Sequence, residues 1–276
     1  MSHLSCIGLD VASQQELAGL VERMLEDATE EVPAQAKTRH LRWRDPSGAS
    51  VAFHLEDEAL ACVTPFFAPA TGLSRWPART TAAADDPSCV HCGGADCDLL
   101  DAGGELATRS AVQWLYFATY RDWLRRPRTF ELEVAGFAHS AAFFADAAGF
   151  EAGQARYWGD RKGPTGQPLR FAEVSFLPEG MFAPAGTGLD QRAVAMITGR
   201  VEQATRLQNA LTGTPFWHVR LTTLPGPLDV VASIAAVEGE PTAGGLAMVR
   251  AWLVGRPVEP PPSPAERSWL RRVFGR

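Results

Sequence analysis

The chain has 276 residues and a formal net charge of -6, from 26 Lys and Arg against 32 Asp and Glu. This acidic balance lacks the overall positive charge that drives most nucleic-acid binding, so only a local basic patch would support that function. The sequence shows neither a basic N-terminal segment leading into an apolar run nor about 18 consecutive apolar residues, and it therefore predicts neither secretion nor a membrane span. Five cysteines, three of them in one short segment, favour a reducing cytoplasm over a disulfide scaffold. The abundance of Ala, Arg and Gly with little Lys is typical of a GC-rich bacterial genome.

The first predicted elements are a short buried strand and a helix. The strand covers Cys6 to Val11, and the helix runs to about Ala28. Ser13 is suited to cap its N-terminus, and Glu16 follows at the spacing of a capping box. Apolar residues then recur at helical spacing, which predicts one buried face.

A β-hairpin is predicted next. The segments His40 to Trp43 and Ser50 to Leu55 flank Asp45-Pro46-Ser47-Gly48, whose Pro and Gly suit a turn. A further strand at Ala59 to Phe67 would complete a β-α-β-β-β unit with the helix on one face of the sheet.

This order of elements in residues 4–67, together with the Arg44 to Gly48 turn, resembles one module of the glyoxalase-like vicinal oxygen chelate family. The resemblance implies a metal held by His, Glu or Gln side chains on the strands, and a metal-dependent enzyme. His54 and Glu56 are the nearest candidates for such ligands. No second module with the same helix follows, and a lone His on a strand is more often a packing residue.

The middle of the chain alternates between loop and regular structure. Residues 68–104, rich in Ala, Pro, Asp and Gly, are predicted to form an ordered loop or knuckle. The stretch Ala107 to Leu124 fits a helix slightly better than a strand. Two strands are predicted at Phe130 to Phe144 and Phe171 to Phe176, with a loop between them.

A Pro- and Gly-rich stretch from Pro178 to Gly188 is the predicted domain boundary. After it come four predicted strands, which cover residues 194–204, 216–223, 228–234 and 245–255. Their pattern resembles an OB-fold, although other small β domains share it. The predicted class is therefore α+β: a mixed α/β-sheet domain at residues 1–180 and a small all-β OB-like barrel at residues 189–256.

Three cysteines give the sharpest chemical signal. Cys89 and Cys92 have the spacing that lets two thiolates face one tetrahedral metal, and Gly93-Gly94 would let Cys97 reach the same centre. A structural zinc site needs a fourth ligand, for which the sequence offers Cys62, Cys6, His54, His91 or an Asp from elsewhere in the chain. Free thiols in an ordered loop explain the cluster equally well, and a Cys89–Cys92 redox pair is a third interpretation.

An OB-like domain also raises the hypothesis of single-stranded nucleic-acid binding. Aromatic residues would stack on bases and arginines would contact phosphates; the candidates are Phe216, Trp217, Trp252, Arg200, Arg206, Arg220 and Arg250. Aromatics that alternate along short strands normally fill a core, and acidic residues balance these arginines. Nucleic acid is therefore a disfavoured partner.

The C-terminal segment is predicted to be a separate unit. Residues 257–264 form a proline-rich, stiff spacer, and residues 265–276 fit a short basic amphipathic helix. Its apolar side carries Trp269, Leu270, Val273 and Phe274, which would dock either on a protein partner or on the chain itself. Taken together, the sequence favours a non-catalytic binding or scaffolding protein with structural zinc at residues 89–97. The alternatives are the metal-dependent enzyme and the nucleic-acid binder.

Overall fold

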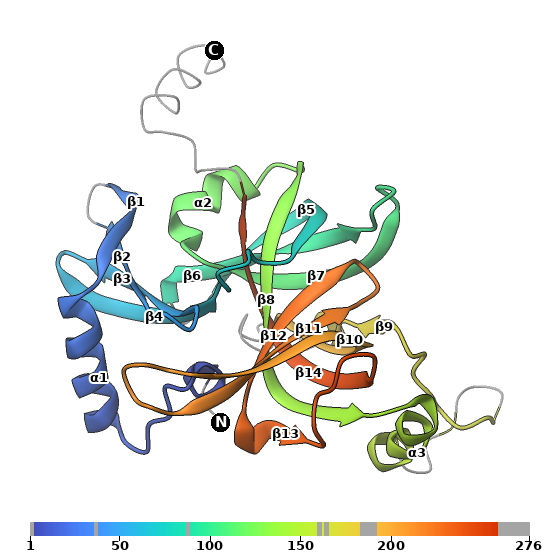
Figure 1. The fold of residues 1–276 in the computed structure, drawn as a ribbon. Coiled ribbons are helices and arrows are strands. Elements are labelled where there is room, and N and C mark those ends of the chain that lie inside the picture. The colour runs from blue at the N-terminus through green and yellow to red at the C-terminus, as the bar shows by residue number, and fades with distance from the viewer. Residues whose placement is uncertain are drawn as a thin grey trace, which may run out of the picture.

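The computed structural model describes residues 3–35, 38–86, 89–158, 162, 166–182 and 192–258. Within these ranges the architecture is mostly sheet with three α-helices, which agrees with the α+β class. A four-stranded sheet near the N-terminus packs beside a larger sheet of ten strands in the described part of the chain (Figure 1).

The N-terminal segment begins with a 3-10 turn, η1 (His3–Ile7), where a strand was predicted. Its last four residues are buried in the core. A buried turn and a short buried strand have the same run of apolar residues, so the sequence did not distinguish them. The helix α1 (Gln14–Glu26) follows as predicted. The Ser13 hydroxyl accepts a hydrogen bond from the Glu16 amide at 3.2 Å, and the Glu16 carboxylate accepts one from the Ala12 amide at 2.8 Å.

The small sheet is an antiparallel meander of β1 (Thr29–Gln35), β2 (Thr38–Arg44), β3 (Ala49–Glu56) and β4 (Ala59–Phe67). The hairpin and the following strand were therefore predicted correctly. Because η1 adds no strand to this sheet, the β-α-β-β-β unit of the vicinal oxygen chelate module is not formed. The helix α1 lies beside the meander, with Val21 and Met24 buried (Figure 1).

The large sheet contains two long strands where a loop was predicted. These are β5 (Arg75–Asp86) and β6 (Cys89–Leu100), which pair with each other and with their neighbours. The predicted helix over residues 107–124 is instead β7 (Leu106–Trp114) followed by the short helix α2 (Phe117–Leu124). A Cβ at Gly93 would clash with the Phe117 ring, so this glycine permits close packing and does not mark a turn.

The strand β8 (Thr129–Phe144) and the helix α3 (Ala147–Trp158) come next, followed by the three-residue strand β9 (Ser175–Leu177), which is shorter than predicted. The four strands predicted for the C-terminal half are all present. They are β10 (Val194–Gln208), β11 (Pro215–Thr222), β12 (Pro227–Ser233) and β14 (Leu246–Pro257), with the two-residue β13 (Val237–Glu238) and the 3-10 turns η2 (Glu179–Phe182) and η3 (Ile234–Ala236) between some of them.

The OB-like barrel over residues 189–256 is not confirmed, because these strands do not close on one another. The strand β12 pairs in parallel with β8, and β14 pairs with β8 from Leu246↔Phe144 to Pro257↔Leu132. Pairing therefore closes one ring through β8, β12, β11, β10 and β14, and a second through β8, β5, β6, β7 and β14. The two long strands β8 and β14 belong to both rings, so strands from either side of the predicted domain boundary share one sheet.

Candidate functional site

Three sulfur atoms meet where the small sheet contacts the large one. They belong to Cys62 on β4 and to Cys89 and Cys92 at the start of β6, and all lie within 4.8 Å of one another. The Sγ atoms of Cys62 and Cys92 are 3.3 Å apart. Cys89 and Cys92 are joined as a disulfide, with their Cα atoms 5.1 Å apart. The arrangement can hold a metal ion once the disulfide is reduced, because thiolates are the species that bind metal.

The two other cysteines lie elsewhere in the core. Cys97, the predicted third ligand, is fully buried on β6 and its thiol contacts the Ala95 carbonyl at 3.7 Å. Burial, reinforced by the charges of Asp96 and Asp98, raises the pKa of the Cys97 thiol well above its usual range. The Cys6 thiol donates to the Ala138 carbonyl at 3.3 Å, and burial raises its pKa to about 11. The structure thus brings Cys62 to Cys89 and Cys92 in place of Cys97.

Cys62 is a protonated thiol in this surrounding at neutral pH. Burial raises its pKa to about 12, and the negative charge of Asp86 adds to the effect. Asp86 is the register partner of Cys89 on the neighbouring strand. Its negative charge is the one that raises the pKa of Cys62. A bound cation would compete with this proton and would also offset the charge of Asp86.

Two histidines continue the row of side chains that begins at Cys62. His40, His54 and Cys62 are register partners on β2, β3 and β4, so they lie on one face of the small sheet. The Nδ1 atoms of His40 and His54 are 2.9 Å apart, and His54 Nε2 lies 3.3 Å from the Thr64 hydroxyl. Burial, with the charge of His91, lowers the pKa of His40 to about 4. Burial, with the charges of His40 and His91, lowers the pKa of His54 to about 3, so both rings are neutral at neutral pH.

The buried end of this row has two unusual features. His40 is fully buried, and its Nε2 has no hydrogen-bond partner among the described residues. The ring of Tyr116 lies 5.4 Å from the His40 ring, and Tyr116 adopts a left-handed backbone with φ of 62°, which is costly for a bulky residue. An unpaired buried nitrogen beside a strained residue is typical of a functional site, although it also occurs in structural cores.

His91 and Glu56, both singled out from the sequence, lie next to this row and face each other. His91 Nε2 is 3.1 Å from the Glu56 carboxylate, whose side chain is half-exposed. His54 and His91 are therefore neighbours of the sulfur cluster but not members of it. His54 and Glu56, the ligands that the vicinal oxygen chelate resemblance implied, each have another polar partner.

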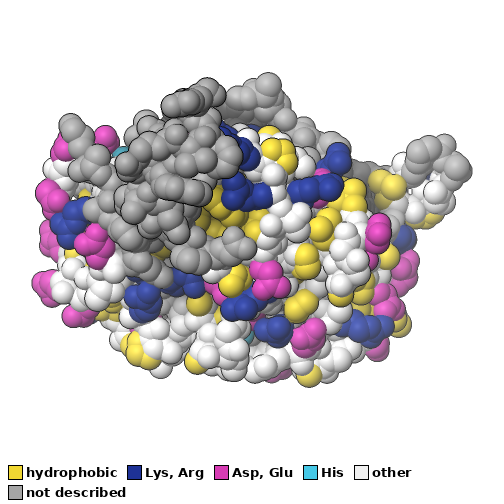
Figure 2. All heavy atoms as spheres, turned by 90° about the horizontal axis from the view of Figure 1, so that it is seen from above, with side chains coloured by type: hydrophobic (Ala, Val, Ile, Leu, Met, Phe, Trp, Pro, Cys, Tyr) yellow, Lys and Arg dark blue, Asp and Glu magenta, His cyan; other side chains and the backbone are white. Residues whose placement is uncertain are grey.

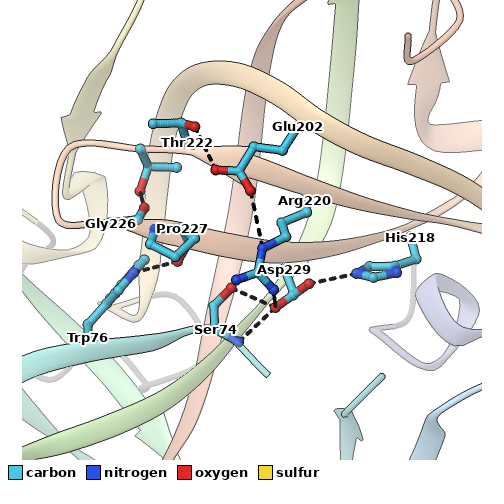
Figure 3. Close-up of polar contacts among 10 residues, drawn as sticks. Ser74, Trp76, Glu202, His218, Arg220, Thr222, Gly226, Pro227 and Asp229 are labelled. Carbon is cyan, nitrogen blue, oxygen red and sulfur yellow. Dashed lines mark hydrogen bonds and ion pairs between the residues drawn. The ribbon is translucent and has the colours of Figure 1, made fainter. Parts of the chain in front are cut away.

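A second polar network surrounds Asp229 in the C-terminal ring (Figure 3). Its fully buried carboxylate accepts hydrogen bonds from the Ser74 amide at 2.7 Å, the Ser74 hydroxyl at 2.6 Å and His218 Nε2 at 2.7 Å. Arg220 contacts the same carboxylate at 3.5 Å and Glu202 at 3.2 Å. Burial alone raises the pKa of Asp229, but the hydrogen bonds from His218 and Ser74 outweigh it and hold the pKa below its ordinary value.

This network does not form a nucleophilic triad. In a triad the histidine accepts the proton of the serine, whereas here Ser74 and His218 each donate to Asp229. The contacts join β12 to β11 and to the segment before β5, which indicates a structural role.

The residues proposed for base stacking are mostly core. Phe216 and Trp252 are buried, and Trp217 is partly buried against the core. Three of the four candidate arginines pair with acids; the pairs are Arg200–Glu173, Arg220–Glu202 and Arg250–Glu179. On the face seen in Figure 2, Lys and Arg side chains are scattered among acidic and apolar ones. The described side chains on that face form no continuous basic groove of the kind that a single strand would need.

The docking residues Trp269, Leu270, Val273 and Phe274 lie outside the described residues, as does most of the spacer. No helix in the described ranges combines the length and the apolar character needed to cross a bilayer.

No protein-family model matches the chain, and no curated protein is similar enough in sequence to count as a relative.

Proposed function

We propose that the reduced protein binds one zinc ion through Cys62, Cys89 and Cys92, and that the metal fastens the small sheet to the large one in a binding or scaffolding protein. The observation that carries this proposal is the convergence of three sulfurs from two different sheets within 4.8 Å. Of the three ligands, only Cys89 and Cys92 are close to each other in the sequence. Convergence of Cys62 with the others therefore depends on the tertiary fold.

The distances suit a tetrahedral thiolate site. With zinc–sulfur bonds of about 2.3 Å, tetrahedral geometry places neighbouring sulfurs about 3.8 Å apart. The sulfurs here lie within 4.8 Å of one another, and those of Cys62 and Cys92 are 3.3 Å apart. Reduction of Cys89–Cys92 and a small adjustment of side chains would produce the required triangle.

The fourth ligand would distinguish a structural from a catalytic zinc. Structural sites are closed by four protein ligands. We propose Asp86 as the fourth, because it is the strand partner of Cys89; it lies outside the group of three sulfurs and would have to move toward the metal. The second candidate function is a metal-dependent enzyme, in which water would occupy that position. It is favoured by the buried Nε2 of His40, which has no hydrogen-bond partner among the described residues and lies in the same row of side chains as Cys62.

The test is metal analysis of protein purified with reductant and without chelator. We expect one zinc per chain, and Co²⁺ in its place should show the intense near-ultraviolet absorption of thiolate ligation. The variants Cys62→Ser and Cys92→Ser should lose this band and the tightly bound zinc. Cys97→Ser is the matched control, since Cys97 lies outside the cluster, and it should retain both.

Alkylation of thiols provides an independent measurement. The disulfide form has three free cysteines, Cys6, Cys62 and Cys97, so oxidised protein should react at no more than three positions after unfolding. Reduced and unfolded protein should react at all five cysteines. Zinc should protect the cluster in the folded, reduced form.

If reduced protein binds no zinc, or if Cys97→Ser loses it as Cys62→Ser does, the proposal fails. An Asp86→Asn variant that keeps zinc and gains a bound water would favour the enzyme.

A further inference from the structure

A cavity lies beside the end of β8, and none of its lining residues belongs to the sulfur cluster. It has a volume of about 400 Å³, within the range of small-molecule sites, and is bordered by β8, α3, β10, η3, β13 and β14. Figure 1 shows α3 and β13 flanking this end of β8. The zinc proposal makes no use of this cavity.

Most of the cavity wall is apolar, and part of it consists of flexible side chains. Phe144, Met196 and Met248 supply an aromatic ring and two thioethers, which adapt well to flat apolar ligands. Small residues keep the space open: Ala142 lines it, and a Cβ added at Gly153 would clash with the Phe144 ring. The cavity therefore depends on small residues at these two positions.

Among the described polar groups beside the cavity, Glu238 is a carboxylate without an ion pair. The Arg250 guanidinium can donate hydrogen bonds but cannot accept them, so the His139 Nδ1 atom 2.9 Å away must be the acceptor. His139 is then a neutral ring whose Nε2–H donates to His3 Nε2 at 2.8 Å. The Arg250 charge is balanced by Glu179 at 2.8 Å. Glu238 lines the cavity at its solvent-exposed edge and has no ion-pair partner among the described residues.

We propose that this cavity binds a small apolar molecule that carries a protonated amine. Glu238 would pair with the ammonium group, and the Phe144 ring would add a cation–π contact. The apolar body would fill the space between the two methionines. A carboxylate ligand is disfavoured, because Arg250 is already paired with Glu179 and Glu238 would repel it.

Three naphthalene probes of equal shape test the charge preference. 1-Naphthylmethylamine, 1-naphthalenemethanol and 1-naphthoate share the ring and differ in charge, and calorimetric titration gives each Kd. We expect the amine to bind about fivefold tighter than the alcohol, the ratio that one partly exposed charge pair supplies, and the naphthoate to bind weakest.

Variants then locate the site. Glu238→Gln should reduce the amine-to-alcohol ratio to about one, whereas Glu240→Gln, an exposed acid two residues away that does not line the cavity, should leave it unchanged. Ala142→Leu should weaken all three probes by filling the cavity; if circular dichroism shows that it does not fold, Ala235→Leu at the exposed edge replaces it. The proposal is overturned if no probe binds, if the alcohol or naphthoate binds as tightly as the amine, or if the two Gln variants behave alike.

Discussion

The Nδ1 atoms of His40 and His54 meet at 2.9 Å across two antiparallel strands, in a core where neither ring is charged at neutral pH. One Nδ1 must donate and the other accept, so these two nitrogens satisfy each other. Replacement of either residue leaves a buried nitrogen without its partner.

His54→Ala should therefore lower the free energy of unfolding by about 2–3 kcal/mol, from a lost hydrogen bond and a cavity in the small sheet. Urea denaturation with reductant and chelator present measures this without a metal contribution. Arg39→Ala on the same hairpin is the control, because Arg39 forms only an exposed ion pair with Glu58 and its loss should cost less than about 0.5 kcal/mol. Equal effects of the two variants would contradict a stabilising role for the histidine pair.

Asp229→Asn should destabilise the protein by about 3 kcal/mol, since the buried carboxylate has donors from Ser74 and His218 and an ion pair with Arg220. Glu173→Gln, which breaks an exposed pair with Arg200, is the matched control and should cost little. A stability loss of similar size in both variants would show that burial of Asp229 is not the cause.

The same carboxylate predicts a pH dependence. Its pKa in the folded protein lies below the value in the unfolded chain, so the unfolded chain binds more protons between the two values. The stabilisation from Asp229 is complete above the unfolded pKa of 3.8 and declines as pH falls through the folded one. Urea titrations from pH 6 to pH 2 should show a shallower acid decline in Asp229→Asn; an identical slope in both proteins would contradict the assignment.

Two glycines predict effects of opposite sign. Gly93→Ala would drive a Cβ into the buried Phe117 ring and should cost about 1–3 kcal/mol. Gly19→Ala lies on the exposed side of α1 with nothing within 4 Å, and should stabilise the protein by about 1 kcal/mol through helix propensity. Thermal unfolding of both variants checks this, and a stabilising Gly93→Ala would refute the packing argument.

Zinc should raise the stability of reduced protein by an amount that grows with the logarithm of the free zinc concentration once this exceeds the Kd. At a free concentration 100 times its Kd, a ligand specific for the folded state adds about 2.7 kcal/mol. Thermal unfolding with and without zinc measures the shift, and Cys62→Ser should abolish it. Oxidised protein, with Cys89 and Cys92 in a disulfide, should show no such shift.

Local signals predicted the local elements well. The Ser13 cap, the turn at Asp45 to Gly48 and the strands of the C-terminal half each depend on neighbouring residues, and the structure contains them all. The segment at residues 75–100 was misread because its Ala, Asp and Gly residues are typical of loops. These residues form strands because both edges are paired within the large sheet.

The site was predicted only in part. Spacing identified Cys89 and Cys92, and Cys62 was among the candidates for a further ligand. Cys97 was misplaced because Gly93 and Gly94 were interpreted as a turn, whereas they continue a strand that carries Cys97 away into the core. His40 was missed, although counting outward from the predicted turn already pairs it with His54. Tyr116 and the Asp229 network depend on contacts between distant segments, which no local pattern contains.

The sharing of β8 and β14 between both rings of strands has a consequence for how the molecule opens. Neither ring can lose these strands without breaking the other, so each half of the chain completes the hydrogen bonding of its counterpart. Amide protons along this central pair should exchange with solvent last and with a common free energy, equal to that of global unfolding. A polypeptide truncated after residue 182 would lack β14 and leave β8 with an open edge, and should therefore aggregate when synthesised alone.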